Sequence, residues 1–222
     1  MNAEVLKYLS VIGEATWQTL IMVFFSTMFS MILGIPLGIL LCTTDSASGL
    51  TPNKTVNQIL SVVINILRAI PFVILVILLF PFTRLVVHTA IGTKASIVPL
   101  TIAAAPFVAR VIESSLKEVD AGVIQAARAM GSNNKQIIFK VLLPEALPSI
   151  VNGITLTIIN LIGYSAMAGT VGGGGLGDVA IRYGYQRYRV EYMLGSVAII
   201  LILVEIIQVI GTHISNKMQA NR

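Results

Sequence analysis

Residues 15–44 read ATWQTLIMVFFSTMFSMILGIPLGILLCTT and contain no charged side chain. A helix that crosses a bilayer needs about 20 consecutive, mostly apolar residues, so this run is long enough to span. A second uncharged run extends from residue 146 to residue 177. Only 11% of the whole chain is charged and 55% is hydrophobic, whereas soluble domains carry about 25% charged residues. These patterns predict an all-α integral membrane protein.

Outward from these runs, the sequence predicts five transmembrane helices in a single domain that covers residues 1–222. The expected spans are approximately residues 15–41, 58–82, 95–113, 146 to the glycines at 172–175, and 192–212. The second span is expected to kink near Pro71, because proline removes a helical hydrogen bond. Residues 84–94 and 178–191 are predicted to be loops that connect spans.

A polar segment, EVDAGVIQAARAMGSNNKQIIFKVLLP at residues 118–144, separates the third and fourth spans. Asp120 suits a helix start, the alanines that follow favour helix, and Gly131 suits a left-handed C-cap. A second helix is predicted over residues 134–143, with Pro144 at the start of the fourth span. Small side chains let a partner approach closely, so the segment is a candidate docking site. An ordinary amphipathic surface helix would show part of the same pattern.

The register of this segment resembles the coupling loop of ABC-importer permeases, where Glu-Ala-Ala, three residues, Gly, nine residues and apolar-x-Leu-Pro recur. Gln125 stands at the usual glutamate position, so the charge is absent there while an acceptor remains. By this resemblance the ATPase-coupling residues are Glu118, Asp120, Gln125, Ala126, Ala127, Gly131, Val141, Leu143 and Pro144.

Nearly the whole chain, about residues 15–212, is similar to the permease subunits of methionine ABC importers. Residues 68–87, 99–124 and 162–188 carry this resemblance, and the last of these segments is the most specific. The resemblance implies a type I importer fold in the bacterial inner membrane, with the N-terminus outside and the C-terminus inside. It also implies a homodimer that passes methionine, in its L and D forms, from an extracytoplasmic binding lipoprotein to the cytoplasm. Two copies of a separate ATPase would bind and hydrolyse the ATP, so the chain itself would need no cofactor and would not be an enzyme.

Residues 163–169, GYSAMAG, fall around the middle of the predicted fourth span. Small residues allow close helix packing, while Tyr164 and Ser165 supply polar groups and Met167 supplies a flexible thioether. We expect these three residues to line a substrate path or gate at the dimer axis, although helix packing at a dimer seam explains them equally well.

Arg68 and Glu205 are the charges deepest within apolar runs. Charges at membrane depth are costly and are usually paired or functional. We expect a structural role, in which each pairs with the other or with backbone, and proton coupling is the alternative.

Other function classes have less support. The chain has no Gly-Lys-Ser/Thr of a phosphate-binding loop, and the glycines at 172, 174 and 177 follow no predicted strand, so a backbone break is expected there. One cysteine and two distant histidines offer no metal cluster or catalytic triad. The basic residues are scattered, which favours contact with lipid headgroups over nucleic acid. An importer of another amino acid or a betaine-type osmolyte, or an ion-coupled carrier acting alone, remains an alternative.

Overall fold

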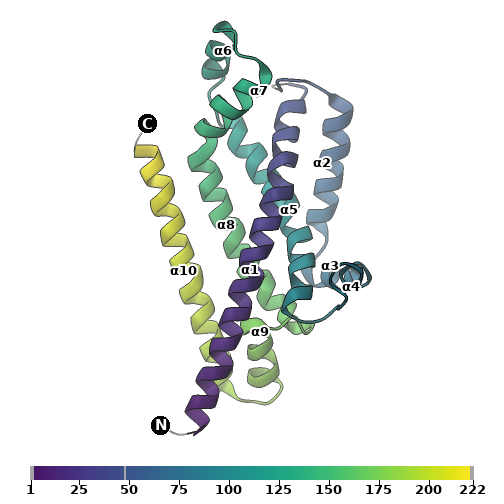
Figure 1. Cartoon of the computed structure of the whole chain (residues 1–222), viewed down its shortest axis with the longest axis vertical. Coiled ribbons are helices and arrows are strands. Elements are labelled where there is room, and N and C mark those ends of the chain that lie inside the picture. Colours follow the sequence, from purple (N-terminus) through teal and green to yellow (C-terminus); the bar gives the residue numbers. More distant parts are fainter. Residues whose placement is uncertain (1–2, 48, 221–222) are drawn as a thin grey trace. The chain divides into compact units, whose positions relative to one another are not determined.

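The computed structural model describes residues 3–47 and 49–220, and these residues form helices and turns without any strand. Figure 1 shows the order of the helices along the chain. The elements are α1 (Ala3–Thr44), α2 (Lys54–Ala69), α3 (Phe72–Leu78), α4 (Phe80–Val87), α5 (Thr93–Lys117), α6 (Ala121–Ala129), α7 (Asn134–Ile137), the π-helical turn η1 (Ile138–Leu142), α8 (Leu143–Thr170), α9 (Gly175–Val179), the π-helical turn η2 (Ala180–Tyr185) and α10 (Val190–Ala220). The predicted all-α membrane fold is therefore confirmed.

Within the described residues, four stretches of helix are long and apolar enough to cross a membrane, namely Glu4–Thr44, Thr93–Lys117, Asn134–Thr170 and Val190–Ala220. A fifth candidate is the pair α2 and α3, which pass the same test together but are bent by 101° at their junction. The break predicted near Pro71 is therefore present, but its angle makes it a sharp turn between two helices instead of a kink within one helix over residues 58–82. Pro71 lacks an N–H and disfavours helical backbone at the preceding residue, so α2 ends at Ala69 and the chain turns sharply.

Two compact units make up the chain. Unit 1 comprises Met1–Ser30, Ile70–Ala104 and Ile158–Gln208, and unit 2 comprises Met31–Ala69, Ala105–Thr157 and Val209–Arg222. Four helices, α1, α5, α8 and α10, each contribute residues to both units.

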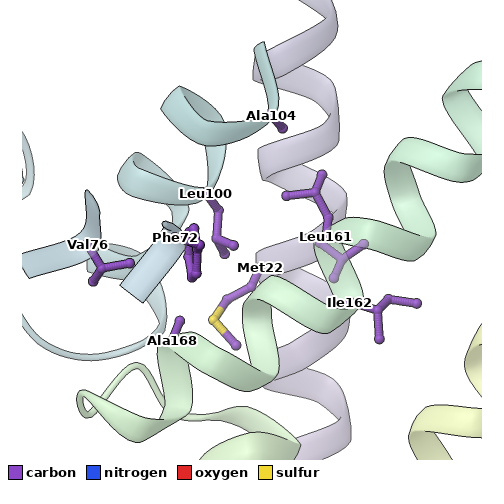
Figure 2. Packing of buried hydrophobic residues seen from close by; sticks show 9 residues of the cluster. Met22, Phe72, Val76, Leu100, Ala104, Leu161, Ile162 and Ala168 are labelled. Carbon is purple, nitrogen blue, oxygen red and sulfur yellow. The ribbon is translucent and has the colours of Figure 1, made fainter. Parts of the chain in front are cut away.

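The core of unit 1 is built from apolar side chains of α1, α3, α5 and α8. Figure 2 shows the Met22 side chain of α1 lying among Phe72 of α3 and Ala168 of α8. Phe72 also stacks on Tyr164, with 4.8 Å between the ring centroids and 8° between the ring planes. These contacts fix the C-terminal part of α8 within unit 1.

A glycine turn follows α8 in unit 1. Gly172, Gly174 and Gly175 all have positive φ values, between 79° and 84°, and only glycine adopts such backbone without strain. The turn is held by α1, because Gln18 Oε1 accepts a hydrogen bond from the Gly175 amide at 2.8 Å and Thr19 Oγ1 accepts one from the Leu176 amide at 2.9 Å. The backbone break predicted here is present.

The predicted loop at residues 178–191 is wrong over most of its length. Helix α9 and the turn η2 occupy it up to Tyr185. Arg182 pairs with Asp178 at 2.6 Å one turn away, and an ion pair of this spacing supports helix although the composition is polar. The hydrogen bond that Arg189 donates to Glu191, at 2.7 Å, raises the pKa of Arg189.

In unit 2, α1 and α5 approach closely through two glycines spaced four residues apart. A Cβ atom added at Gly34 would lie 2.6 Å from Val108 Cβ, and one at Gly38 would lie 2.6 Å from Ile112 Cβ. Glycines at this spacing let membrane helices pack backbone to backbone. Val108 and Ile112 also belong to the unit 2 core, which gathers buried side chains from α5, α6, α7, η1, α8 and the α1–α2 turn.

Candidate coupling site

The polar segment between α5 and α8 forms two short helices, which Figure 1 shows beyond the ends of α5 and α8. Asp120 is the N-cap of α6, and its carboxylate accepts a hydrogen bond from the Gly122 amide at 2.7 Å. At the other end Gly131 has φ +83°, and the Ser132 amide returns to the Ala127 carbonyl at 3.1 Å. This is a left-handed glycine C-cap. The predicted helix start and stop are both confirmed.

Helix α6 has one buried position and a face of small exposed residues. Ala127 is only 3% exposed and belongs to the unit 2 core. The exposed positions on the other side include Gly122, Gln125, Ala126 and Ala129. With no side chain larger than Gln125, this face lets another protein approach the α6 backbone closely.

Helix α7 begins with a complete capping box. The Asn133 side chain accepts a hydrogen bond from the Gln136 amide at 2.9 Å, and the Gln136 side chain accepts one from the Asn133 amide at 2.8 Å. The two bonds satisfy two amides that the helix start would otherwise leave unpaired. In addition, Asn134 donates to the Leu50 carbonyl in the α1–α2 turn at 3.3 Å.

The expectation that a separate second helix ends before Pro144 is wrong. Helix α7 continues through η1 into α8, and residues 134–170 form one helical stretch. In η1 the Leu143 amide bonds to the Ile138 carbonyl, five residues back. A π-helical turn of this kind accommodates Pro144, which has no N–H to continue the regular pattern. Val141 and Leu143 pack against the unit 2 core, and Pro144 is exposed.

Glu118 precedes α6 and is tied to α8. Its carboxylate accepts a hydrogen bond from the Ser149 hydroxyl at 2.7 Å. Glu118, Asp120 and Glu145 line a cavity of about 320 Å³ together with Ser115 and Ser149. Three carboxylates therefore gather at this cavity before the start of α6, whereas Gln125 on α6 itself is neutral.

A group of ion pairs at the end of α5 that precedes the coupling segment was not predicted from the sequence. Lys117 Nζ lies 2.8 Å from Asp45 Oδ2 and 2.9 Å from Glu113 Oε1, and Arg110 Nη1 lies 2.7 Å from Glu113 Oε2. The spacing of Arg110, Glu113 and Lys117 by three and four residues indicates ion pairs along α5, since residues at these spacings are neighbours on a helix. Asp45 could not be added from sequence, because it is 72 residues from Lys117.

Residues 163–169 lie in the last two turns of α8, not around the middle of a span as expected. Ser165 is 1% exposed and donates to the Ile162 carbonyl at 2.7 Å, and Tyr164 is occupied by its stack on Phe72. Met167 is 45% exposed. The three predicted pathway residues therefore point in different directions.

Met167 shares the outward side of α8 with Asn160 and Gly163, which are also exposed. They lie on the same side of the helix because they precede Met167 by seven and four residues.

Arg68 and Glu205 have separate surroundings. The Arg68 guanidinium lies over the ring of Phe107, 5.9 Å from its centroid, so its partner is an aromatic face and not a carboxylate. Glu205 is exposed on α10, and within residues 3–47 and 49–220 no ion pair includes it. An ion pair between Arg68 and Glu205, one form of the expected structural role, is not present among the described residues.

Comparison with known proteins places these features in one family. The family described as "Binding-protein-dependent transport system inner membrane component" matches residues 34–219. The probable D-methionine transport system permease protein MetI of Vibrio cholerae is 56% identical over 204 residues, which cover 92% of this chain and 90% of that protein. The methionine import system permease protein MetP of Bacillus subtilis is 48% identical over 171 residues, or 77% of each chain.

Solved structures agree with the sequence relatives. A structure of inward-facing conformations of the MetNI methionine ABC transporter contains a chain with a TM-score of 0.93 and 44% identity, covering 98% of this chain and 99% of that one. An amino acid ABC transporter is similar in fold alone, with a TM-score of 0.74 and 19% identity. Since the family match covers most of its length, this chain belongs to the binding-protein-dependent transport system inner membrane components, the multi-pass permease subunits of ABC importers.

Proposed function

We propose that this chain is the membrane-spanning subunit of an importer that takes up methionine and is driven by ATP. The observation that carries the proposal is the coupling segment. Helix α6 is capped by Asp120 and Gly131, is anchored through Ala127, and exposes Gly122, Ala126 and Ala129 on the side opposite Ala127. The choice of methionine as substrate rests on the relatives that are named as methionine permeases.

In this proposal two copies of the chain form a homodimer, and each binds one copy of a separate ATPase through α6. The ATPase holds the ATP, and an extracytoplasmic methionine-binding lipoprotein delivers the substrate. Residues 118–144 then face the cytoplasm. With five spans, the N-terminus lies outside and the C-terminus inside. A single permease domain over residues 1–222 is supported by α1, α5, α8 and α10, because each of these helices contributes residues to both units.

The test is uptake of labelled methionine into proteoliposomes that contain the chain, its cognate ATPase and its binding protein. We expect uptake only with ATP inside the vesicles, and we expect unlabelled L- and D-methionine to compete. Competition by another amino acid or by betaine, with no effect of methionine, would keep the mechanism and replace the substrate. Uptake that needs no ATP would overturn the proposal in favour of an ion-coupled carrier.

We further propose that the outward side of α8 lines the substrate path. Asn160 and Met167 are exposed there, and Gly163 between them has no neighbouring atom within 4 Å of an added Cβ. A polar amide facing lipid is unfavourable, so this side is better suited to a second subunit or to water. Tyr164 and Ser165 would then shape the path from behind, by fixing the α8 backbone.

Replacing Met167 with alanine is expected to change the rate of methionine uptake while the complex still assembles. The reason is that Met167 is exposed, so its loss opens no cavity in the unit 1 core. Initial uptake rates and the KM for methionine, measured on reconstituted complex of normal subunit composition, provide the check. Uptake kinetics identical to the wild type would remove Met167 from the path.

A further inference from the structure

The ion pairs on α5 form a continuous chain of contacts within unit 2. Asp45 of the α1–α2 turn contacts Lys117, Lys117 contacts Glu113, and Glu113 contacts Arg110. Arg110 then reaches α2, where its Nη2 donates to Asn65 Oδ1 at 2.9 Å and to the Ser61 carbonyl at 3.4 Å. We call these four charged residues the α5 ion network. It joins the turn before α2 to the middle of α2 by way of α5.

Glu113 is the centre of this network. It is 7% exposed, and each of its two carboxylate oxygens accepts a hydrogen bond from a different cation. A carboxylate with so little access to water needs partners that satisfy it, and removal of one partner is costly. The Nε atom of Arg110 is buried without a partner in the described part of the chain. The arrangement therefore keeps Arg110 in place at the expense of one unsatisfied donor.

The same α1–α2 turn is bound to the coupling segment. Leu50 in this turn packs with Leu116 and Ala127 in the unit 2 core, and its carbonyl accepts the hydrogen bond from Asn134 of α7. Before Leu50, the Gly49 amide donates a hydrogen bond to the Asp45 carbonyl at 3.0 Å. Static contacts therefore connect α6 and α7 to the turn through Leu50, and the turn to Lys117 through Asp45.

We propose that the α5 ion network transmits the movement of the docked coupling segment to α2 and so sets how much substrate is moved per ATP hydrolysed. This inference rests on the proposed function, in which an ATPase binds α6. Asp45, Glu113, Lys117 and Arg110 are then positioning residues that contact neither ATP nor substrate. Three of the four charged residues lie on α5, and the contacts of this row with Asp45 at one end and with Asn65 of α2 at the other suit the role, because they connect the turn to α2 through discrete partners.

The test measures ATP hydrolysis and methionine uptake in the same proteoliposomes, with the full complex of chain, ATPase and binding protein. Lys117→Met and Asp45→Asn are each expected to lower the methionine taken up per ATP at least about fivefold, the lower end of typical coupling between sites. The ATPase should still co-purify in the wild-type ratio, because the α6 face is unchanged. Lys117→Arg keeps the charge and is expected to stay near the wild-type ratio.

The double variant and a matched control complete the design. If Asp45 and Lys117 act through each other, Asp45→Asn combined with Lys117→Met should lower the ratio no further than the more severe single change. Lys54→Met is the matched control, because Lys54 is an exposed lysine at the start of α2 and no ion pair among the described residues includes it. It should leave the ratio unchanged.

Several results would overturn the inference. These are a wild-type ratio in Lys117→Met, an equal fall in Lys54→Met, or independent effects that multiply in the double variant. If Lys117→Met fails to assemble, Asp45→Asn decides, since it leaves the contact between Lys117 and Glu113 in place. A wild-type complex that shows no methionine uptake with ATP would instead contradict the proposed function. Failure of the network inference and failure of the proposed function are therefore distinguishable.

Discussion

Replacing Ala126 with tryptophan is expected to release the ATPase and to abolish uptake driven by ATP. Ala126 is exposed on α6, on the side that presents Gly122, Gln125 and Ala129. An indole there would hold the partner away from the α6 backbone across the whole small face. Loss of a central interface contact costs about 2 kcal/mol or more, which corresponds to a fall in ATPase affinity of about thirtyfold or more.

The measurement for Ala126→Trp is the binding of purified ATPase to the chain in nanodiscs, followed by uptake in proteoliposomes. Ala126→Ser is the control, since it keeps the side chain small at the same position. The chain itself should remain folded in both variants, because Ala126 makes no contribution to the unit 2 core. Wild-type ATPase affinity in the tryptophan variant would show that the partner docks elsewhere.

Replacing Gly177 with alanine is expected to destabilise unit 1 by about 1–3 kcal/mol, the usual cost of forcing extra atoms into a packed site. A Cβ at Gly177 would lie 2.1 Å from the Ala166 carbonyl oxygen and 2.4 Å from Ala166 Cα. Both are backbone atoms of α8, so no rotation of a side chain relieves the clash. The turn after α8 would have to move away from the helix.

The matched control is the same substitution at Gly163, in α8, where no atom lies within 4 Å of the added Cβ. Thermal unfolding of the two variants in detergent should separate them, with a lower midpoint for Gly177→Ala only. Equal midpoints would mean that α9 does not pack on α8 as closely as these contacts require.

Local chemistry explains which features could be predicted from the sequence. The uncharged run at residues 15–44 is sufficient to predict a spanning helix, although α1 already begins at Ala3, and the caps of α6 depend on Asp120 and Gly131 themselves. The angle at Pro71 is different: a proline signals a break, but the direction of the chain after it depends on the packing of Phe72 against α8 and α5 in unit 1.

Features that join distant residues could not be predicted. The contact of Asp45 with Lys117 depends on how the α1–α2 turn packs. For Ser165 and Met167, sequence indicated a helix but not which side of it is buried, and a shift of two positions separates a 1% exposed residue from a 45% exposed one. The docking and pathway roles of individual residues remain predictions.

The π-helical turn η1 affects the direction in which the exposed face of α6 points. Such a turn amounts to a single-residue insertion in an α-helix, and each residue of an α-helix advances the azimuth by about 100°. Deleting one residue within 138–142 would therefore rotate everything before it by roughly a quarter turn about the α8 axis, with the sequence of α6 untouched. The length of this stretch, more than its composition, is what selection on docking would have to preserve.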